Sequence, residues 1–277
     1  MSGANGRPRG NFLHNVIAGL LAATNKAMHA DSLAGGNGLL QRIDPRVKVA
    51  GLLALILATA LATKLWVIGA ILFLAIALAG LSRLPSSVLK PAWVSALLFT
   101  GMIAAPAVFL TPGRSVYHLP HLNWDITAQG LTTASYLILR VETSTTLALL
   151  LVFTTPWAHV LKALRIFRVP AVFVVVLGMA FRYILLLLAT AHEMFESRTS
   201  RTVGRLSGSD SRRLAISSAG VLLSKTLQLS GEVFLAMQSR GFRGEVYILD
   251  EFRMAGRDWT ALTLFAGASA AAIWAGR

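Results

Sequence analysis

Residues 49–81 read VAGLLALILATALATKLWVIGAILFLAIALAGL, an apolar stretch whose only charged residue is Lys64. A helix needs about 20 apolar residues to cross the hydrocarbon of a bilayer, so this stretch is too long for a single crossing. Polar side chains at Thr63-Lys64 interrupt it near its middle. The pattern therefore predicts two short membrane-spanning helices joined as a hairpin.

Basic residues flank this predicted hairpin on both sides. Arg42, Arg46 and Lys48 precede or open it, and Arg83 and Lys90 follow it. Lys and Arg accumulate in loops on the cytoplasmic side of a membrane. Both ends of the hairpin are therefore expected on that side, and the N-terminus of the chain is expected to be cytoplasmic.

The composition of the whole chain is that of an integral membrane protein. Of its 277 residues, 55% are hydrophobic and 14% are charged, and the mean hydropathy is +0.64. Soluble domains are about 25% charged. The net charge of +14 would suggest nucleic acid in a soluble protein, but here it fits cytoplasmic loops, and we expect no nucleic-acid partner. The chain has no cysteine, which excludes disulfides and thiolate chemistry.

Three further apolar segments are predicted to cross, at about 92–110, 131–154 and 259–276, which gives five spans with the C-terminus outside. The loop after 110 is rich in Pro and Gly and suits the outer side. Arg140 and Glu142 lie within the predicted span 131–154, where charges are costly and should face protein or water. An ion pathway through them is an alternative use.

The segment 170–189, PAVFVVVLGMAFRYILLLLA, is apolar enough to cross, but its neighbours argue against it. If it crossed, Arg182 would lie at membrane depth and the densest basic cluster of the chain would lie outside, against the usual distribution of charge. That cluster consists of Arg198, Arg201, Arg205, Arg212 and Arg213. We therefore expect 170–189 to stay on the inner side as an apolar helix packed against other helices or a partner, with a crossing as the alternative.

Two helical stretches of this region, about 171–202 and 212–241, end in similar tripeptides. The first is Ser200-Arg201-Thr202 and the second is Ser239-Arg240-Gly241. One explanation is structural, because a cation is stabilised by the exposed carbonyls at a helix C-terminus and Gly241 suits a left-handed turn there. The other is recognition, because a guanidinium can dock into an acidic or carbonyl-lined groove of a partner.

The second tripeptide and its flanks, AMQSRGFRGEVYILDEFRM at 236–254, resemble the transmembrane T component of energy-coupling factor transporters, in particular the CbiQ type. IDPRVKVAGLLALILATA at 43–60 is similar to the family's opening, and the resemblance covers about 40–277. The family's signature is a pair of Ala-Arg-Gly-like motifs that end two cytoplasmic coupling helices. Each arginine of the pair enters a groove on one of two ATPase subunits.

The resemblance implies that the two tripeptides, Ser200, Arg201, Thr202 and Ser239, Arg240, Gly241, are the ATPase-coupling motifs, with Arg198 and Arg243 as additional coupling residues. Both tripeptides have Ser in place of Ala, and the first ends in Thr. Arg198 lies one helical turn before Arg201, so the register of the first motif is open between them, and we favour Arg201.

By the same resemblance the chain is a non-catalytic coupling subunit of a multi-pass importer in the bacterial inner membrane. Its implied partners are two cytoplasmic CbiO-like ATPase subunits and a CbiM-like substrate-binding membrane subunit. A small accessory membrane subunit is an optional further partner. The chain itself needs no cofactor, and the cargo is a transition-metal ion, with cobalt favoured over nickel or a vitamin. The expected organisation is an N-terminal amphipathic, cytoplasmic segment (1–41), transmembrane helices (42–154), a cytoplasmic coupling-helix region (155–257) and a C-terminal transmembrane helix (258–277).

Other functions are less well supported by the sequence. The chain lacks the GxxxxGK[ST] loop that binds ATP. His118 and His121 lie in the outer loop without the carboxylates that would complete a metal site, so no metal is assigned to them. An integral-membrane enzyme acting on a phosphate-bearing lipid or substrate would suit the Arg-rich loops, but no DxxD-type acidic set is present. A secondary carrier would need inverted repeats, which the sequence does not show.

Overall fold

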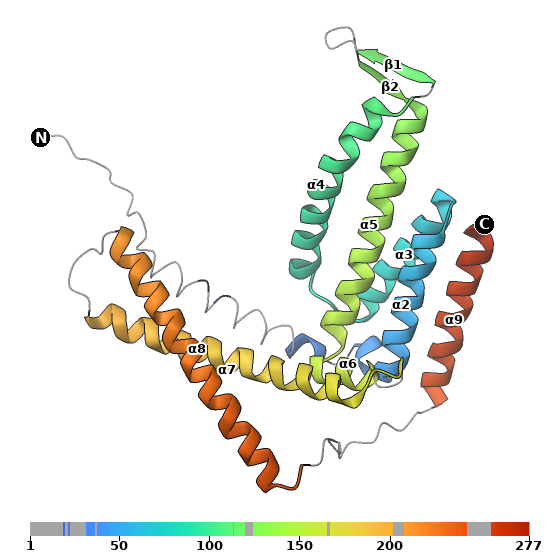
Figure 1. The fold of residues 1–277 in the computed structure, drawn as a ribbon. Coiled ribbons are helices and arrows are strands. Elements are labelled where there is room, and N and C mark those ends of the chain that lie inside the picture. Colours follow the sequence, from blue (N-terminus) through green and yellow to red (C-terminus); the bar gives the residue numbers. More distant parts are fainter. Residues whose placement is uncertain are drawn as a thin grey trace, which may run out of the picture. The chain divides into compact units, whose positions relative to one another are not determined.

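The computed structural model describes residues 19, 22, 32–36, 38–112, 114–119, 124–164, 167–201, 208–242 and 256–276. The chain divides into two compact units. One holds α7 (Ala171–Arg201) and α8 (Gly208–Ser239), and the other holds the remaining labelled elements (Figure 1). Apart from one short pair of strands, the described elements are helices, which confirms the expected all-α membrane fold.

The larger unit is a bundle of helices. After the 3-10 turn η1 (Leu40–Arg42), the chain forms α2 (Pro45–Leu61), α3 (Leu65–Leu81), α4 (Ser86–Leu110), α5 (Ala128–Thr154), α6 (Trp157–Leu164) and, at the end of the sequence, α9 (Gly256–Gly276). The predicted break at Thr63-Lys64 is confirmed, because α2 ends and α3 begins on either side of it. Of the N-terminal amphipathic segment expected at 1–41, the structure describes only residues 19, 22, 32–36 and 38–41.

The segment expected to be an outer loop contains two strands. β1 (Ser115–Leu119) pairs antiparallel with β2 (Trp124–Thr127). Aromatic and β-branched residues in both strands favour this conformation, and the high Pro and Gly content of the loop obscured that signal. Thr127 then begins α5, because its hydroxyl accepts the Gly130 N–H at 3.1 Å as a helix cap.

The core of the bundle lies where α2 meets α3, α5 and α9. Gly51 allows the close approach of α2 to α9, because a Cβ atom added there would lie 2.5 Å from Cγ of Phe265. Apolar side chains of all four helices are buried around this contact. They include Leu52, Leu55, Ile68, Ile71, Leu147, Leu150, Ala261 and Ala272.

Buried polar contacts join the helices at the end of the bundle where α2 and α9 begin, which we call the basic end. Asp44 caps α2 by accepting the Arg46 N–H at 2.8 Å, and its own N–H donates to Asp258 of α9 at 2.9 Å. The Lys48 ammonium, only 1% exposed, donates to the Thr154 carbonyl at 2.8 Å. The starts of α2 and α9 and the end of α5 are thereby held together.

At the opposite end, the break between α2 and α3 is held by hydrogen bonds to its backbone. Thr63 N–H donates to the Gly276 carbonyl at 3.0 Å, and the Tyr136 hydroxyl donates to the Thr63 carbonyl at 2.5 Å. The Arg140 guanidinium donates to the Ala62 carbonyl at 2.9 Å. The expectation that Arg140 faces protein is confirmed, because it satisfies a carbonyl that the end of α2 leaves without a helical partner.

By length and composition, four of the described helices could cross a membrane, namely α4, α5, α7 and α9. α2 and α3 have 17 residues each, which is about 26 Å of helix and slightly less than the ~30 Å of bilayer hydrocarbon. Local thinning of the bilayer can accommodate such a difference. The count of five spans, and the placement of 170–189 on the inner side, stay predictions.

We predict that Gly51→Ala lowers the stability of the bundle by about 1–3 kcal/mol, because Phe265 must move to make room for the added methyl group. Gly69→Ala in α3 is the matched control, because a Cβ there meets nothing within 4 Å. Thermal unfolding of both variants in detergent measures the difference. Equal melting temperatures for the two variants would contradict the close α2–α9 contact.

Candidate coupling site at two helix ends

α7 carries the first of the two candidate motifs. It begins directly after Pro170, because helical geometry is disfavoured for Val169, the residue before the proline. The Pro170 carbonyl accepts the Phe173 N–H at 3.0 Å. It ends at Arg201, and both Arg198 and Arg201 lie in its last turn. Cations at this position are stabilised by the negative end of the helix dipole.

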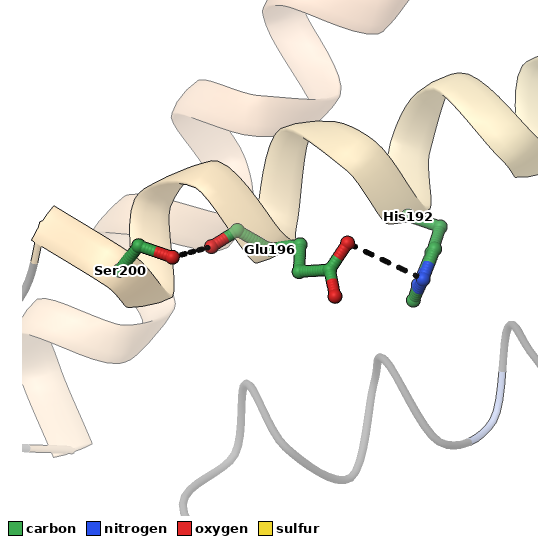
Figure 2. A network of polar contacts seen from close by, with 3 residues as sticks. All are labelled: His192, Glu196 and Ser200. Atoms are coloured by element: carbon green, nitrogen blue, oxygen red, sulfur yellow. Dashed lines mark hydrogen bonds and ion pairs between the residues drawn. The ribbon is translucent and has the colours of Figure 1, made fainter.

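Three residues spaced four apart share one face of α7 near this end (Figure 2). The His192 Nε2 and Glu196 Oε2 atoms lie 3.7 Å apart, an ion pair when the histidine is protonated. The Ser200 hydroxyl donates to the backbone carbonyl of Glu196 at 3.0 Å. The first serine of the motif is therefore engaged within its own helix, and the neighbouring arginine is the group that the helix end presents.

α8 ends in a well-defined left-handed turn. Gly241 has a φ of +79°, and its N–H donates to the Gln238 carbonyl at 2.9 Å. The Phe242 N–H reaches back to the Met237 carbonyl at 3.0 Å. This pair of bonds is the Schellman arrangement, which satisfies the last carbonyls of a helix. The left-handed turn expected at Gly241 is confirmed.

The second motif uses its serine in the same way as the first. The Ser239 hydroxyl donates to the Ala236 carbonyl at 2.9 Å, as Ser200 does to Glu196. A serine whose hydroxyl donates to a carbonyl of the preceding turn presents no free polar group on the helix surface, and in this respect it resembles alanine. This gives a physical reason why Ser can replace Ala at the first position of both tripeptides.

The arginines of the two motifs are available for binding. Arg201 and Arg240 are both exposed, and neither guanidinium pairs with another residue in the part of the chain that the structure describes. Arg198 is half-buried and does have an interaction partner. These environments favour Arg201 as the first coupling arginine. Thr202 and Arg243 lie outside the described residues.

α7 and α8 touch at a crossing, and their C-terminal ends lie at different tips of the crossed pair (Figure 1). Both helices also expose large apolar side chains. On α8, Ile216, Leu223, Leu227 and Phe234 are all exposed, and their spacing of seven, four and seven residues places them on one face. No other described segment of the chain covers this face. An exposed apolar face of this kind is typical of a surface that contacts another protein or the membrane.

Other candidate residues do not form a site among the residues described. No group of three or more His, Asp or Glu side chains there could hold a metal ion, and His121 is not among those residues. Arg140 and Glu142 do not bond to each other. The Arg140 guanidinium donates to the Ala62 carbonyl at the end of α2. One carboxylate oxygen of Glu142 is buried without a hydrogen-bond partner in the described structure.

Comparison with known proteins gives one family. A family model described as CbiQ, Cobalt transport protein, matches residues 36–248. An uncharacterized protein of Methanocaldococcus jannaschii is 36% identical over 216 residues, which is 76% of this chain and 73% of the relative. Two proteins named Energy-coupling factor transporter transmembrane protein EcfT are also similar. That of Brevibacillus brevis is 29% identical over 76% of this chain and 83% of its own, and that of Acidaminococcus fermentans is 26% identical over 76% and 81%.

We predict that Gly241→Val destabilises the end of α8 by about 1–2 kcal/mol, because a β-branched residue is strained at a positive φ. Gly241→Asn is the control, because Asn tolerates this conformation. A Cβ atom added at Gly241 would have no other atom within 4 Å, so the substitution tests the strain of the backbone conformation and not a steric clash. Hydrogen exchange at residues 237–242 should be faster in the Val variant alone. Equal protection in both would exclude the proposed role of Gly241.

Proposed function

The chain belongs to the CbiQ family, and from this premise we propose that it is the transmembrane coupling subunit of an energy-coupling factor transporter. It carries no P-loop of its own, so hydrolysis is assigned to two separate CbiO-like ATPase subunits. The observation that supports the proposal best is the pair of long helices that each end in an exposed arginine, Arg201 and Arg240.

Each arginine would bind one ATPase subunit. A guanidinium presents several N–H donors in a fixed plane, so a groove lined by carboxylates or carbonyls can hold it in one orientation. At the end of α8, the left-handed turn at Gly241 stops the helix immediately after Arg240 and fixes the direction in which the chain leaves. Thr202 is proposed as the last residue of the first motif, and Arg198 and Arg243 as further contacts.

Closure of the ATPase pair would then move α7 and α8. A helix transmits displacement when it is packed against its neighbour, because packed interfaces deform little. The exposed apolar face of α8, with Ile216, Leu223, Leu227 and Phe234, offers such an interface to a CbiM-like substrate-binding membrane subunit. Apolar residues of α7, among them Val172 and Phe173, offer another.

The cargo we propose is a transition-metal ion, and cobalt is the metal that the description of the family names. The metal would be bound by the partner subunit and not by this chain. We propose that the protein lies in the cell membrane with its N-terminus in the cytoplasm, because the basic flanks of the first two apolar helices favour that side. No observation on the described residues favours the enzymatic alternative.

Charge reversal at the two arginines tests this function. The protein would be coexpressed with its cognate ATPase subunits, as wild type, as Arg201→Glu, as Arg240→Glu and as the double variant. Loss of a buried, hydrogen-bonded charge at an interface costs about 2–5 kcal/mol, so each single variant should weaken ATPase retention at least about tenfold. The double variant should lose both ATPase retention and metal uptake by cells.

Arg213→Glu is the matched control, since Arg213 is also exposed on α8 but lies outside both motifs. It should insert, retain the ATPase and support uptake like the wild type. If the double variant inserts normally and still retains the ATPase with undiminished uptake, the arginines only cap their helices and the proposed coupling role is wrong.

A further inference from the structure

A groove of about 750 Å³ opens at the basic end of the bundle, in the compact unit that does not hold the coupling motifs. It lies between η1, the second half of α3 and the first half of α9, all within one compact unit. Its walls are apolar and include Leu74 and Leu78 of α3 and Leu264 and Ala268 of α9. Its volume is in the range of sites that bind small molecules.

Three arginines line this groove, and each comes from a different element. Arg42 ends η1, Arg83 follows α3 and Arg257 lies in the first turn of α9. All three are exposed, and none of their guanidinium groups pairs with a carboxylate in the described part of the chain. The groove therefore combines apolar walls with three positively charged groups, and a guanidinium is well suited to bind a phosphate.

Arg83 lies in a backbone conformation that arginine rarely adopts, with a φ of +52°. Its N–H donates to the Gly80 carbonyl at 3.0 Å, and the following Leu84 N–H donates to the Ala79 carbonyl at 3.2 Å. These are the same two bonds that Gly241 and its neighbour make at the end of α8. Glycine suits this position, and an arginine there costs about 1 kcal/mol. Arg168, which does not line the groove, has a similar φ of +59°, so the strain at Arg83 supports a ligand only together with its place in the groove.

Arg257 is also unfavourably placed for helix stability. The first turn of a helix carries a positive partial charge, which favours acidic over basic side chains. The neighbouring Asp258 does not project freely beside it, because Asp258 is 4% exposed and accepts the Asp44 N–H. Two of the three arginines therefore occupy positions that folding would assign to other residues.

We propose that this groove binds an anionic phospholipid. The headgroup phosphate would lie between Arg42, Arg83 and Arg257, which can donate several charge-assisted hydrogen bonds to it. An acyl chain would lie along Leu78 and Leu264, both of which line the groove. A free phosphate would use the arginines but leave the apolar walls uncovered, so the combination of the two favours a lipid. The bound lipid would join η1, the end of α3 and the start of α9.

The test measures lipid binding to the full chain in detergent by native mass spectrometry, with phosphatidylglycerol and phosphatidylcholine as the probes. The wild type should bind one phosphatidylglycerol at least tenfold more tightly than phosphatidylcholine. Arg42→Gln/Arg83→Gly/Arg257→Gln should lose that preference. The control Lys90→Gln/Arg114→Gln/Arg213→Gln removes three positive charges from exposed positions outside the groove and should keep it.

Melting temperatures give a second readout that does not depend on the triple variant. Arg83→Gly should melt higher than the wild type without lipid, because the strained residue is replaced by glycine, and it should gain less on addition of phosphatidylglycerol. Equal affinity of the wild type for both lipids, or an unchanged preference in the triple variant, would overturn the proposal. Displacement of phosphatidylglycerol by millimolar inorganic phosphate would also overturn it, since the site would then be one for free phosphate.

Discussion

The buried ammonium group of Lys48 is the contact on which the bundle depends. Removing such a charge from water costs several kcal/mol, and a good hydrogen bond offsets part of that cost. Here it bonds to the last carbonyl of α5, while Asp44 and Asp258 join the starts of α2 and α9 beside it. Three helices that are distant in the sequence are thereby fixed at one end, and the residues that open α2 have a structural role.

That fixed end brings together features that have different functions. The groove with its three arginines lies there, and so does α6, which packs against α2 and precedes the proline that begins α7. The coupling motifs belong to a separate compact unit with few buried side chains. A bundle with its own core and a helix pair with exposed apolar faces fit the proposed coupling role, in which the bundle stays in the membrane and α7 and α8 move against partners.

The sequence predicted those features that depend on neighbouring residues. The break at Thr63-Lys64 and the turn at Gly241 follow from local polarity and from the conformational freedom of glycine. The contact from Lys48 to Thr154 joins residues 106 positions apart and could not be found by periodicity. The groove could not be found for the same reason, because Arg42, Arg83 and Arg257 come from parts of the chain that are far apart in the sequence. The positive φ of Arg83 is likewise visible only in the structure.

Crosslinking from the two helix ends tests the central claim most directly, and the absence of cysteine from the chain makes it practical. Ser200→Cys and Ser239→Cys place single thiols beside the coupling arginines, and Thr132→Cys places one near the start of α5, next to the strand hairpin. A maleimide–succinimide reagent would be added to the complex with its ATPase. The account predicts that both coupling positions form a covalent product with an ATPase subunit and that position 132 forms none. Crosslinking no stronger at the two motifs than at position 132 would contradict it.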